Sequence, residues 1–413
     1  MNYVVDSACE VAVIGLGFVG LPAAIMLARA GKKVIGVDID DSLIRRLHAG
    51  ECPINEPSVA TVFHDAATRA NFTATTTVPV ADTYIIAVPT PLHARKKVAA
   101  LDALEITTAS IVSKLRRGAL VIVESTIPPR TCEEIIKPIL ERSGLRVGAD
   151  LLLAHCPERL YPGNVADEII NNDRIIGGCN EAANERASAL YASFVKGKLL
   201  STDMLTAEFC KLIENTYRDV NIALVNELAM VAERLGTSID AAIDLANLHP
   251  RVSLLRPGIG VGGHCIPIDP WFIAEVAPEQ TELIPAARRI NDRMPYVIAG
   301  RIRHALAGIH DPSIGIYGVT YKPDVDDQRE SPAWEIVRLL REDGYRVDVA
   351  DPIAHLGEAK TLLELAAGKD ALIVLVPHQQ ARRELAEQRD EIVSTLRHPI
   401  LITFGSSSSD GTR

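Results

Sequence analysis

The sequence predicts an α/β protein in which two doubly wound domains are joined by a central helical domain that contains a long helix. Short apolar β-rich runs alternate with helical patterns over residues 1–202, which is typical of a parallel sheet covered on both faces. A continuous helical pattern follows from 203 to 235, and the strand–helix alternation resumes after 306. We therefore expect domains at residues 1–202, 203–305 and 306–413.

The first domain opens with an apolar strand, "EVAVIGLG", that enters a glycine turn. A helix, "LPAAIMLARAG", follows it and leads to a second strand, "KKVIGVDID". Three later segments have the same strand pattern: "TYIIAVPTP", "ALVIVESTI" and "LLLAHCPE". These strands are expected to form one parallel sheet.

The stretch from 203 to 235 predicts a single helix with Asp203 or Thr206 as its N-cap and Gly236 as its stop signal. A helix longer than usual suggests a spine between domains or a subunit interface. Two helices broken near Asn221 are the alternative.

The last third contains four strand patterns, "SIGIYGVTYKP", "YRVDVADP", "ALIVLVP" and "PILITFG", and one clear helix, "SPAWEIVRLLREDG". It therefore predicts a second doubly wound unit, but without a GxGxxG turn. The final "SSSSDGTR" is expected to be a frayed tail.

Composition excludes several classes of protein. The net charge of −10 argues against a general nucleic-acid binder, although a local basic pocket for an anionic small molecule remains compatible with it. No apolar run is long enough to cross a bilayer, so no membrane association and a cytoplasmic location are expected. The seven cysteines form no CxxC pair, which predicts neither a disulfide framework nor a thiolate metal site.

The segment "GLGFVG" places Gly15, Gly17 and Gly20 in GxGxxG register, with Phe18 and Val19 between the last two glycines. A strand precedes the motif and a helix follows it, which is the context of a Rossmann-like dinucleotide-binding unit. The pyrophosphate is expected at the N-terminus of that helix, where free N–H groups favour negative charge.

A carboxylate ends the second strand, because Asp38 lies 18 residues after Gly20. It is placed to accept hydrogen bonds from the adenosine ribose hydroxyls and would repel a 2′-phosphate. NAD is therefore the predicted cofactor, in preference to NADP.

A second glycine-rich stretch, "GIGVGGHCIPIDP", spans residues 258–270 and presents Cys265 after four glycines. Glycine is used where the backbone turns to positive φ or where another group approaches closely. From these residues alone, Cys265 is either a nucleophile beside a substrate-holding loop or a small apolar residue after a turn.

Several motifs in order, "HCPERLYPGN", "KLIENTYRDVNIA", "GIGVGGHCIPIDP" and "YKPDVDDQRESP", resemble the UDP-glucose/GDP-mannose dehydrogenase family over essentially the whole chain. The resemblance implies an N-terminal NAD domain, a central helical domain with homodimer contacts and a C-terminal domain that binds the nucleotide diphosphate. It also implies a four-electron oxidation of the C6 hydroxyl of a sugar nucleotide, with two NAD consumed.

The resemblance implies that Cys265 holds the intermediate aldehyde as a thiohemiacetal and, after the second oxidation, as a thioester. It implies that Lys211 stabilises the oxyanion, that Asp269 removes the hydroxyl proton through a water, and that Asn215 positions that water. Glu158 is implied to activate water for thioester hydrolysis. Without the resemblance, Lys211 would be an ordinary solvated helix lysine and Glu158 an exposed turn acid.

Further contacts follow from the same resemblance. The segment "ESTIPP" matches a family threonine near the nicotinamide, although capping of the following helix is an alternative for Thr126. The implied cofactor contacts outside the glycine turn are Thr90, Ser125, Thr126 and Arg329. The implied substrate contacts are Glu158, Arg159, Lys211, Asn215, Arg251, Gly258, Gly260, Gly262 and Lys322.

The sugar is indicated by one departure from the family pattern. The glucose branch reads Pro-Glu-Phe-Leu-x-Glu-Gly where this chain has "PERLYPG", so that Arg159 and Pro162 replace the Phe and the second Glu. The motifs are more similar to those of the branch that acts on UDP-N-acetyl-D-mannosamine, for surface polysaccharide synthesis. UDP-N-acetylglucosamine and UDP-glucose are the alternative substrates, and a non-catalytic nucleotide-sugar sensor is the alternative of another class.

Overall fold

The computed structural model describes residues 9–93, 95–160, 163–357 and 360–405. These residues form two compact units. The first contains the described residues up to Glu214 together with Trp271–Ala277, and the second contains Asn215–Pro270 together with the described residues from Pro278 onward. The serine-rich tail and Pro162 lie outside the described residues.

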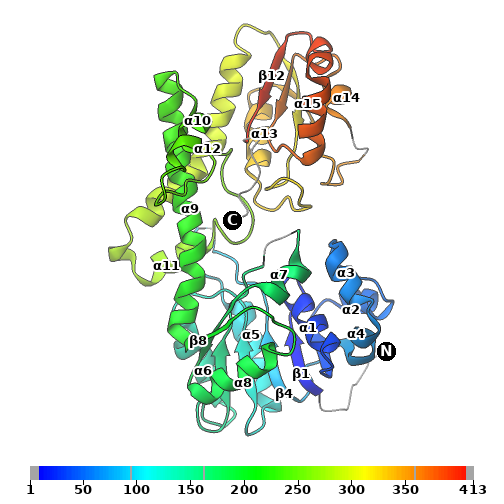
Figure 1. Cartoon of the computed structure of the whole chain (residues 1–413), viewed down its shortest axis with the longest axis vertical. Coiled ribbons are helices and arrows are strands. Elements are labelled where there is room, and N and C mark those ends of the chain that lie inside the picture. The colour runs from blue at the N-terminus through cyan, green and yellow to red at the C-terminus, as the bar shows by residue number, and fades with distance from the viewer. Residues whose placement is uncertain (1–8, 94, 161–162, 358–359, 406–413) are drawn as a thin grey trace. The chain divides into compact units, whose positions relative to one another are not determined.

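The first unit is built on an eight-stranded sheet (Figure 1). Its strands are β1 (Cys9–Ile14), β2 (Val34–Val37), β3 (Phe72–Thr75), β4 (Ala81–Ile86), β5 (Leu120–Val123), β6 (Leu152–His155), β7 (Arg174–Gly178) and β8 (Leu199–Asp203). Their order in the sheet is β3-β2-β1-β4-β5-β6-β7-β8. The five predicted strands are confirmed as β1, β2, β4, β5 and β6, whereas β3, β7 and β8 were not predicted.

One pair of strands in this sheet is antiparallel. The described strands pair in parallel except for β6 and β7, which are antiparallel with Ala154 opposite Gly178 and His155 opposite Gly177. The five predicted strands pair in parallel with one another, as expected, and the antiparallel pair arises with β7, which was not predicted. An apolar run specifies burial but not the direction in which the strand crosses the sheet.

Helices cover both faces of this sheet. One hydrophobic core lies under α1 (Gly20–Arg29), α2 (Asp41–His48), α3 (Pro57–Phe63), α7 (Val165–Asn171) and α8 (Glu181–Tyr191). The other lies under α5 (Asp102–Ile111), the π-helical turn η2 (Cys132–Ile136) and α6 (Lys137–Glu141). Two short elements, α4 (Ala66–Asn71) and the 3₁₀ turn η1 (Val112–Lys114), complete the unit. The unit is thus doubly wound.

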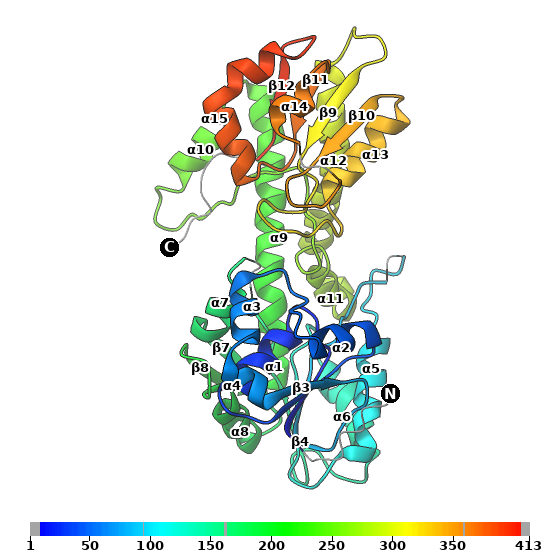
Figure 2. The same cartoon turned by 90° about the vertical axis from the view of Figure 1, so that its right-hand side faces the viewer.

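The second unit contains a four-stranded parallel sheet (Figure 2). Its strands are β9 (Ser313–Tyr317), β10 (Arg346–Ala350), β11 (Ala371–Val374) and β12 (Ile400–Thr403), in the order β10-β9-β11-β12. One core packs against α12 (Leu283–Ala305) and α13 (Pro332–Glu342), and the other against α14 (Leu362–Ala366) and α15 (Gln379–Ser394). The predicted second doubly wound domain is confirmed.

The first turn of each sheet has the same local geometry. Gly15 follows β1 with φ +93°, and Gly318 follows β9 with φ +84°. In each case the next residue donates its N–H to a carboxylate at the end of the neighbouring strand, which is Asp38 in the first unit and Asp351 in the second. A Cβ on either glycine would overlap the backbone that follows β4 or β11, so both positions require glycine.

The predicted long helix is confirmed as α9 (Met204–Leu235), and the division between the units falls within it. Asp203 caps it, because its Oδ1 accepts the N–H of Thr206 at 2.9 Å, and Gly236 follows its end with φ +69°. The helix is continuous through Asn221, so the broken-helix alternative is wrong.

The second unit also contains α10 (Ile239–Ala246) and the 3₁₀ turn η3 (Pro278–Gln280). The helix α11 (Asp269–Val276) begins in the second unit and belongs to the first from Trp271 onward. None of the described helices combines the length and the apolar character that a membrane crossing requires.

Candidate active site

The first glycine turn has a different steric requirement at each glycine. A Cβ on Gly15 or Gly20 would come closer than 3.0 Å to backbone atoms, of Ala87 and of Gly15 respectively. A Cβ on Gly17 would meet no described atom within 4 Å. Gly15 and Gly20 are therefore required by packing, whereas Gly17 borders open space at the start of α1, where free N–H groups favour an anion.

Residues around the turn complete a cradle for a dinucleotide. Val19 occupies the N-cap position of α1, and Phe18 is 37% exposed. Asp38 Oδ2 accepts the N–H of Leu16 at 2.8 Å, and its Oδ1 accepts the N–H of Asp40 at 3.0 Å. Asp38 is only half-buried, so its carboxylate is accessible to ribose hydroxyls.

In the second unit the equivalent carboxylate, that of Asp351, is buried. Asp351 is 4% exposed, and its Oδ2 lies 3.1 Å from Nε2 of His378. Because His378 Nδ1 accepts the N–H of Asp324 at 2.9 Å, Nε2 carries the ring proton and donates to Asp351. The two turns thus share a geometry, but the carboxylate of the first unit is the accessible one.

Hydroxyl groups join the carboxyl ends of β4 and β5. The Oγ1 of Thr90 donates to the carbonyl of Thr126 at 2.6 Å, and the Oγ of Ser125 donates to the carbonyl of Val88 at 2.7 Å. The structure therefore brings Thr90, Ser125 and Thr126 together at the edge where doubly wound sheets bind ligands.

The alternative in which Thr126 caps the following helix is wrong. The helical segment η2 begins at Cys132, and the N–H groups of Arg130 and Cys132 are accepted by the carboxylate of Glu208, at 2.6 and 2.8 Å. Glu208 belongs to α9 and is 1% exposed. Thr126 is thus available for the strand-end arrangement instead.

Glu158 lies just after β6 and is held from two sides. Its Oε1 accepts the N–H of Arg159 at 2.7 Å, and its Oε2 contacts the guanidinium of Arg174. The guanidinium of Arg159 itself donates to Glu214 at 2.9 Å and to the carbonyl of Asp173. Glu158 is therefore not the exposed turn acid of the alternative, and Arg159 has protein partners of its own.

Lys211 is 8% exposed on α9, which excludes the ordinary solvated lysine. It lies near His155 at the end of β6. Burial, together with the positive charge of Lys211, lowers the pKa of His155 to about 3, so this histidine is neutral at physiological pH. A buried cation beside a neutral ring is compatible with binding negative oxygen.

In the second unit the structure links three of the predicted catalytic residues. Asn215 Nδ2 donates to Asp269 Oδ2 at 2.6 Å, and these two side chains are 8% and 2% exposed. The carbonyl of Cys265 accepts the N–H of Asp269 at 2.9 Å, so a backbone turn connects the thiol-bearing residue to the start of α11.

A polar network positions the beginning of the second glycine stretch. The N–H of Gly258 donates to Asn226 at 2.8 Å, and Asn226 donates in turn to Asn291 at 3.0 Å. Asn291 donates to the carboxylate of Asp219 at 2.8 Å. These buried contacts join α9 and α12 to the loop that carries Cys265.

The next glycines of the stretch are required by packing against a neighbouring loop. A Cβ on Gly262 would lie 2.8 Å from Cβ of Tyr321 and 2.9 Å from Cδ of Pro332, and Gly260 has φ +133°. Gly263 has φ +86°, and a Cβ on it would lie 3.1 Å from the ring of Tyr321. The bare backbone therefore lets the loop from 321 to 332 lie against it, a role not expected from the sequence.

The predicted cationic contacts occupy different environments. The guanidinium of Arg329 donates two hydrogen bonds to Asp327, at 2.8 and 2.7 Å, while the residue remains exposed. Lys322 is half-buried, and its carbonyl accepts the hydroxyl of Thr320 at 2.9 Å. Arg251 is exposed. Their ligand contacts remain predictions.

Cys265 differs from the other six cysteines, all of which lie within the described residues, because it is the exposed one. Burial raises the pKa of Cys9 to about 11 and raises the pKa values of Cys52, Cys132 and Cys210. These thiols are thus poor nucleophiles. In the described part of the chain, no group of three or more His, Cys, Asp or Glu is arranged to hold a metal ion.

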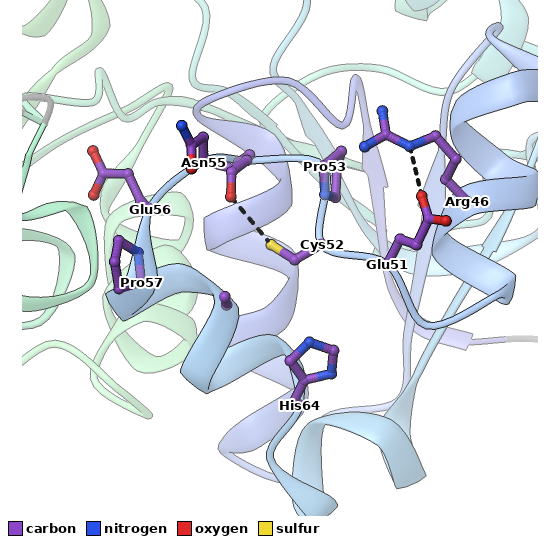
Figure 3. A pocket seen from close by; sticks show the side chains of 10 residues that line it. Arg46, Glu51, Cys52, Pro53, Asn55, Glu56, Pro57 and His64 are labelled. Atoms are coloured by element: carbon purple, nitrogen blue, oxygen red, sulfur yellow. Dashed lines mark hydrogen bonds and ion pairs between the residues drawn. The ribbon is translucent and has the colours of Figure 1, made fainter. Parts of the chain in front are cut away.

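A pocket in the first unit lies between α2 and α3 (Figure 3). Cys52 and the side chains around it line this pocket, and Glu56 lies at its edge. The Glu56 carboxylate accepts the N–H groups of Gly163 at 2.6 Å and Val165 at 3.2 Å. The predicted site residues, all of them described, do not line it, but Glu56 anchors the end of the segment that begins with Glu158.

Three family models match consecutive parts of the chain. They describe the UDP-glucose/GDP-mannose dehydrogenase family, as its NAD binding domain at residues 9–195, its central domain at 205–293 and its UDP binding domain at 315–403.

Individual relatives cover almost the whole chain. A protein of Methanococcus aeolicus named UDP-N-acetyl-D-mannosamine dehydrogenase is 44% identical over 95% of this chain and 90% of its own length. A protein of Ralstonia nicotianae named NDP-N-acetyl-D-galactosaminuronic acid dehydrogenase is 41% identical over 90% of this chain and 92% of its own. The solved structure of a UDP-D-ManNAc dehydrogenase from Pyrococcus horikoshii has 40% identity and a TM-score of 0.91, covering 97% of this chain and 96% of that one.

Proposed function

The chain belongs to the UDP-glucose/GDP-mannose dehydrogenase family, and from this membership we propose that it oxidises the C6 hydroxyl of UDP-N-acetyl-D-mannosamine to the carboxylate in two steps. It is an NAD-dependent nucleotide-sugar dehydrogenase with separate domains for NAD and for the UDP moiety. The proposed part concerns the sugar, the two steps and the residues that perform them. The observation that carries the choice of sugar is the near full-length similarity to relatives bearing that name.

The first glycine turn fits NAD. Open space at Gly17 and the free N–H groups of α1 suit the pyrophosphate, and the accessible carboxylate of Asp38 suits the ribose. Thr90, Ser125 and Thr126 are proposed to lie on the nicotinamide side. When bound, NAD would accept one hydride in each oxidation.

The proposed covalent chemistry uses Cys265. Removal of a hydride and a proton converts the C6 alcohol to an aldehyde, and addition of the thiol gives a thiohemiacetal. Loss of a second hydride and proton leaves a thioester, and water then breaks its C–S bond to release the carboxylate and the thiol. The aldehyde therefore stays bound throughout. The exposure of Cys265 and its link to Asp269 support this role.

The other catalytic roles are those that membership of the family implies for the matching residues. Lys211 stabilises the negative oxygen of the alkoxide and thiohemiacetal. Asp269 and Asn215 hold the water that takes the hydroxyl proton, a pairing supported by their hydrogen bond. Glu158 activates the water that hydrolyses the thioester. Arg159, Arg251, Lys322 and the glycines of the second stretch remain proposed substrate contacts.

A homodimer is the proposed assembly. Exposed apolar side chains repeat along one helix, α9, at positions 205, 209, 213, 217, 224, 228, 231 and 235. The spacing of three, four or seven residues places them along one face. A second copy of the same face would cover this stripe from Leu205 to Leu235. A cytoplasmic location and a role in surface polysaccharide synthesis also remain proposals.

The test is an NADH-release assay with four substrates: UDP-N-acetylmannosamine, UDP-N-acetylglucosamine, UDP-N-acetylgalactosamine and UDP-glucose. We expect UDP-N-acetylmannosamine to be preferred, with two NADH formed for each uronate. Turnover of UDP-glucose alone would refute the choice of sugar, and one NADH per sugar would refute the second step. Binding of NAD and the UDP-sugar without NADH would indicate a sensor.

The covalent role is tested by Cys265→Ser, with Cys52→Ser as the matched control in the pocket of the first unit. Cys265→Ser should bind NAD normally and lose uronate formation, whereas Cys52→Ser should keep it. Undiminished uronate from Cys265→Ser would exclude the thioester route.

A further inference from the structure

Glu158 belongs to a buried cluster of four side chains, which we call the Arg174 cluster: Glu124, Glu158, Arg174 and Tyr191. Arg174 is 4% exposed. One of its terminal nitrogens donates to Glu124 Oε1 at 3.0 Å and the other donates to Glu158 Oε2. Its guanidinium carbon lies 4.2 Å from the centre of the Tyr191 ring, whose hydroxyl donates to Glu124 Oε1 at 2.6 Å. Both terminal nitrogens of Arg174 thus donate to carboxylates, and the face of its guanidinium lies over an aromatic ring.

The antiparallel pairing of β6 and β7 produces the contact between Glu158 and Arg174. The register places His155 opposite Gly177. Extending it by three residues, past the end of β6 and toward the start of β7, places Glu158 opposite Arg174. A parallel β7 would bring its other end to this position. The reversed strand therefore carries a cation to the residue proposed to activate water.

Glu124 connects the same cluster to the predicted cofactor contacts. It directly follows β5 and precedes Ser125 and Thr126 in the chain. Burial raises the pKa of Glu124, with Arg174 opposing the shift. Its Oε2 is buried and has no hydrogen-bond partner among the described residues.

A buried ion cluster of this kind is a weak source of stability, because removing the charges from water costs as much as their attraction returns. Such a cluster is more informative as a means of orienting one group. Within the described part of the chain, one Glu158 oxygen accepts a hydrogen bond from Arg159 N–H and the other from Arg174, and a carboxylate oxygen can accept a second donor.

We propose that Arg174 is a positioning residue that fixes the orientation of the Glu158 carboxylate for thioester hydrolysis. The proposal rests on the role of Glu158 in the proposed function. In this role Arg174 serves the final, hydrolytic step, and its loss leaves the rates of the two hydride transfers unchanged. A purely structural arginine would affect all steps together, through loss of folded protein.

The test compares Arg174→Met and Arg174→Lys with the full-length wild type in rapid mixing with NAD and UDP-N-acetylmannosamine. The matched control is Arg186→Met, which removes an exposed arginine of α8 that donates to the carbonyl of Gly118. We expect Arg174→Met to release two NADH per site at close to the wild-type rate and then to slow about 100-fold in steady state, the range for loss of one acid–base function. Intact-mass analysis should show the uronyl thioester on the enzyme.

Arg174→Lys restores a positive charge without the two-pronged geometry, so it should recover part of the steady-state rate. If Arg174→Met does not fold, Arg174→Lys decides, with a smaller accumulation of thioester expected. An equal fall in the burst and steady-state rates without thioester, or an unchanged steady-state rate, would overturn the positioning role. A wild type that releases no NADH would instead overturn the proposed function and the positioning role with it.

Discussion

The first glycine turn allows the same added methyl group to be compared at positions with different surroundings. At Gly20 a Cβ would overlap the carbonyl of Gly15 and lie 3.1 Å from the Cβ of Ala87, and backbone cannot move aside as the end of a flexible side chain can. At Gly17 a Cβ would meet no described atom within 4 Å, and φ lies outside the left-handed region. Gly20→Ala should therefore damage the fold, and Gly17→Ala should damage NAD binding alone.

The magnitudes follow from the steric environment. Overpacking costs about 1–3 kcal/mol, and Gly20→Ala should reach the upper end because the overlapping atom belongs to the backbone. At roughly 2–4 °C per kcal/mol, Tm should fall by about 6–12 °C. Gly17→Ala should leave stability unchanged or raise it by up to about 1 kcal/mol, because alanine restricts the unfolded chain. If steric overlap of its methyl group with the pyrophosphate costs a similar 1–3 kcal/mol of binding free energy, Kd for NAD should rise about 5- to 150-fold.

The assays are thermal unfolding without ligand and calorimetric titration with NAD. Gly31→Ala is the control for backbone strain, because Gly31 has the same φ of +93° as Gly15 but open space around its Cβ position. The difference between Gly15→Ala and Gly31→Ala in Tm then isolates the steric overlap. Wild-type NAD affinity in Gly17→Ala would refute the placement of the pyrophosphate, and a wild-type Tm in Gly20→Ala would refute the packing argument.

Three further predictions concern the second unit. Burial alone would raise the pKa of Asp351, but hydrogen bonds from His378 and backbone N–H groups hold that pKa below its usual value of about 3.9, so the stabilisation by this carboxylate is present above that pH and is lost as the pH falls below it. In urea unfolding, Asp351→Asn should therefore be less stable than wild type at pH 7 and should lose less stability on acidification. An equal pH dependence of the two proteins would contradict this argument. Asn215→Ala removes the side chain that donates to buried Asp269 over 2.6 Å, so the free energy of unfolding in urea should fall by about 1–3 kcal/mol and the first hydride transfer should slow in single-turnover assays. An unchanged transfer rate would exclude Asn215 from the mechanism. Leu228→Asp places a charge in the exposed stripe of α9 and should give a folded monomer by sedimentation, an outcome that a stable dimer of this variant would rule out.

The local features were the ones that could be predicted from the residues. The glycine turn after the first strand follows from the GxGxxG register, and the structure shows Gly15 there with φ +93° and no room for a Cβ. The long helix α9 follows from one uninterrupted helical pattern between Asp203 and Gly236. These properties depend on residues close together in the chain, so a single sequence contains the information.

Other parts of the candidate site could not be predicted because they depend on partners far away in the chain. Arg174 was visible only as a charged residue opening an apolar run, and nothing in that run indicates that β7 reverses direction. Glu208 reads as an ordinary helix glutamate until the fold brings it to the N–H groups of Arg130 and Cys132.

By itself, the sequence determined the two α/β domains, the dinucleotide turn, the helix between them and the candidate thiol, since hydrophobic period, backbone φ and side-chain chemistry are encoded locally. Only the tertiary structure decided that a reversed strand brings Arg174 to Glu158 and that glycines of the second stretch accommodate the loop from 321 to 332. Those contacts join segments whose mutual placement is set by the packing of whole sheets and helices, a long-range property that no short pattern specifies.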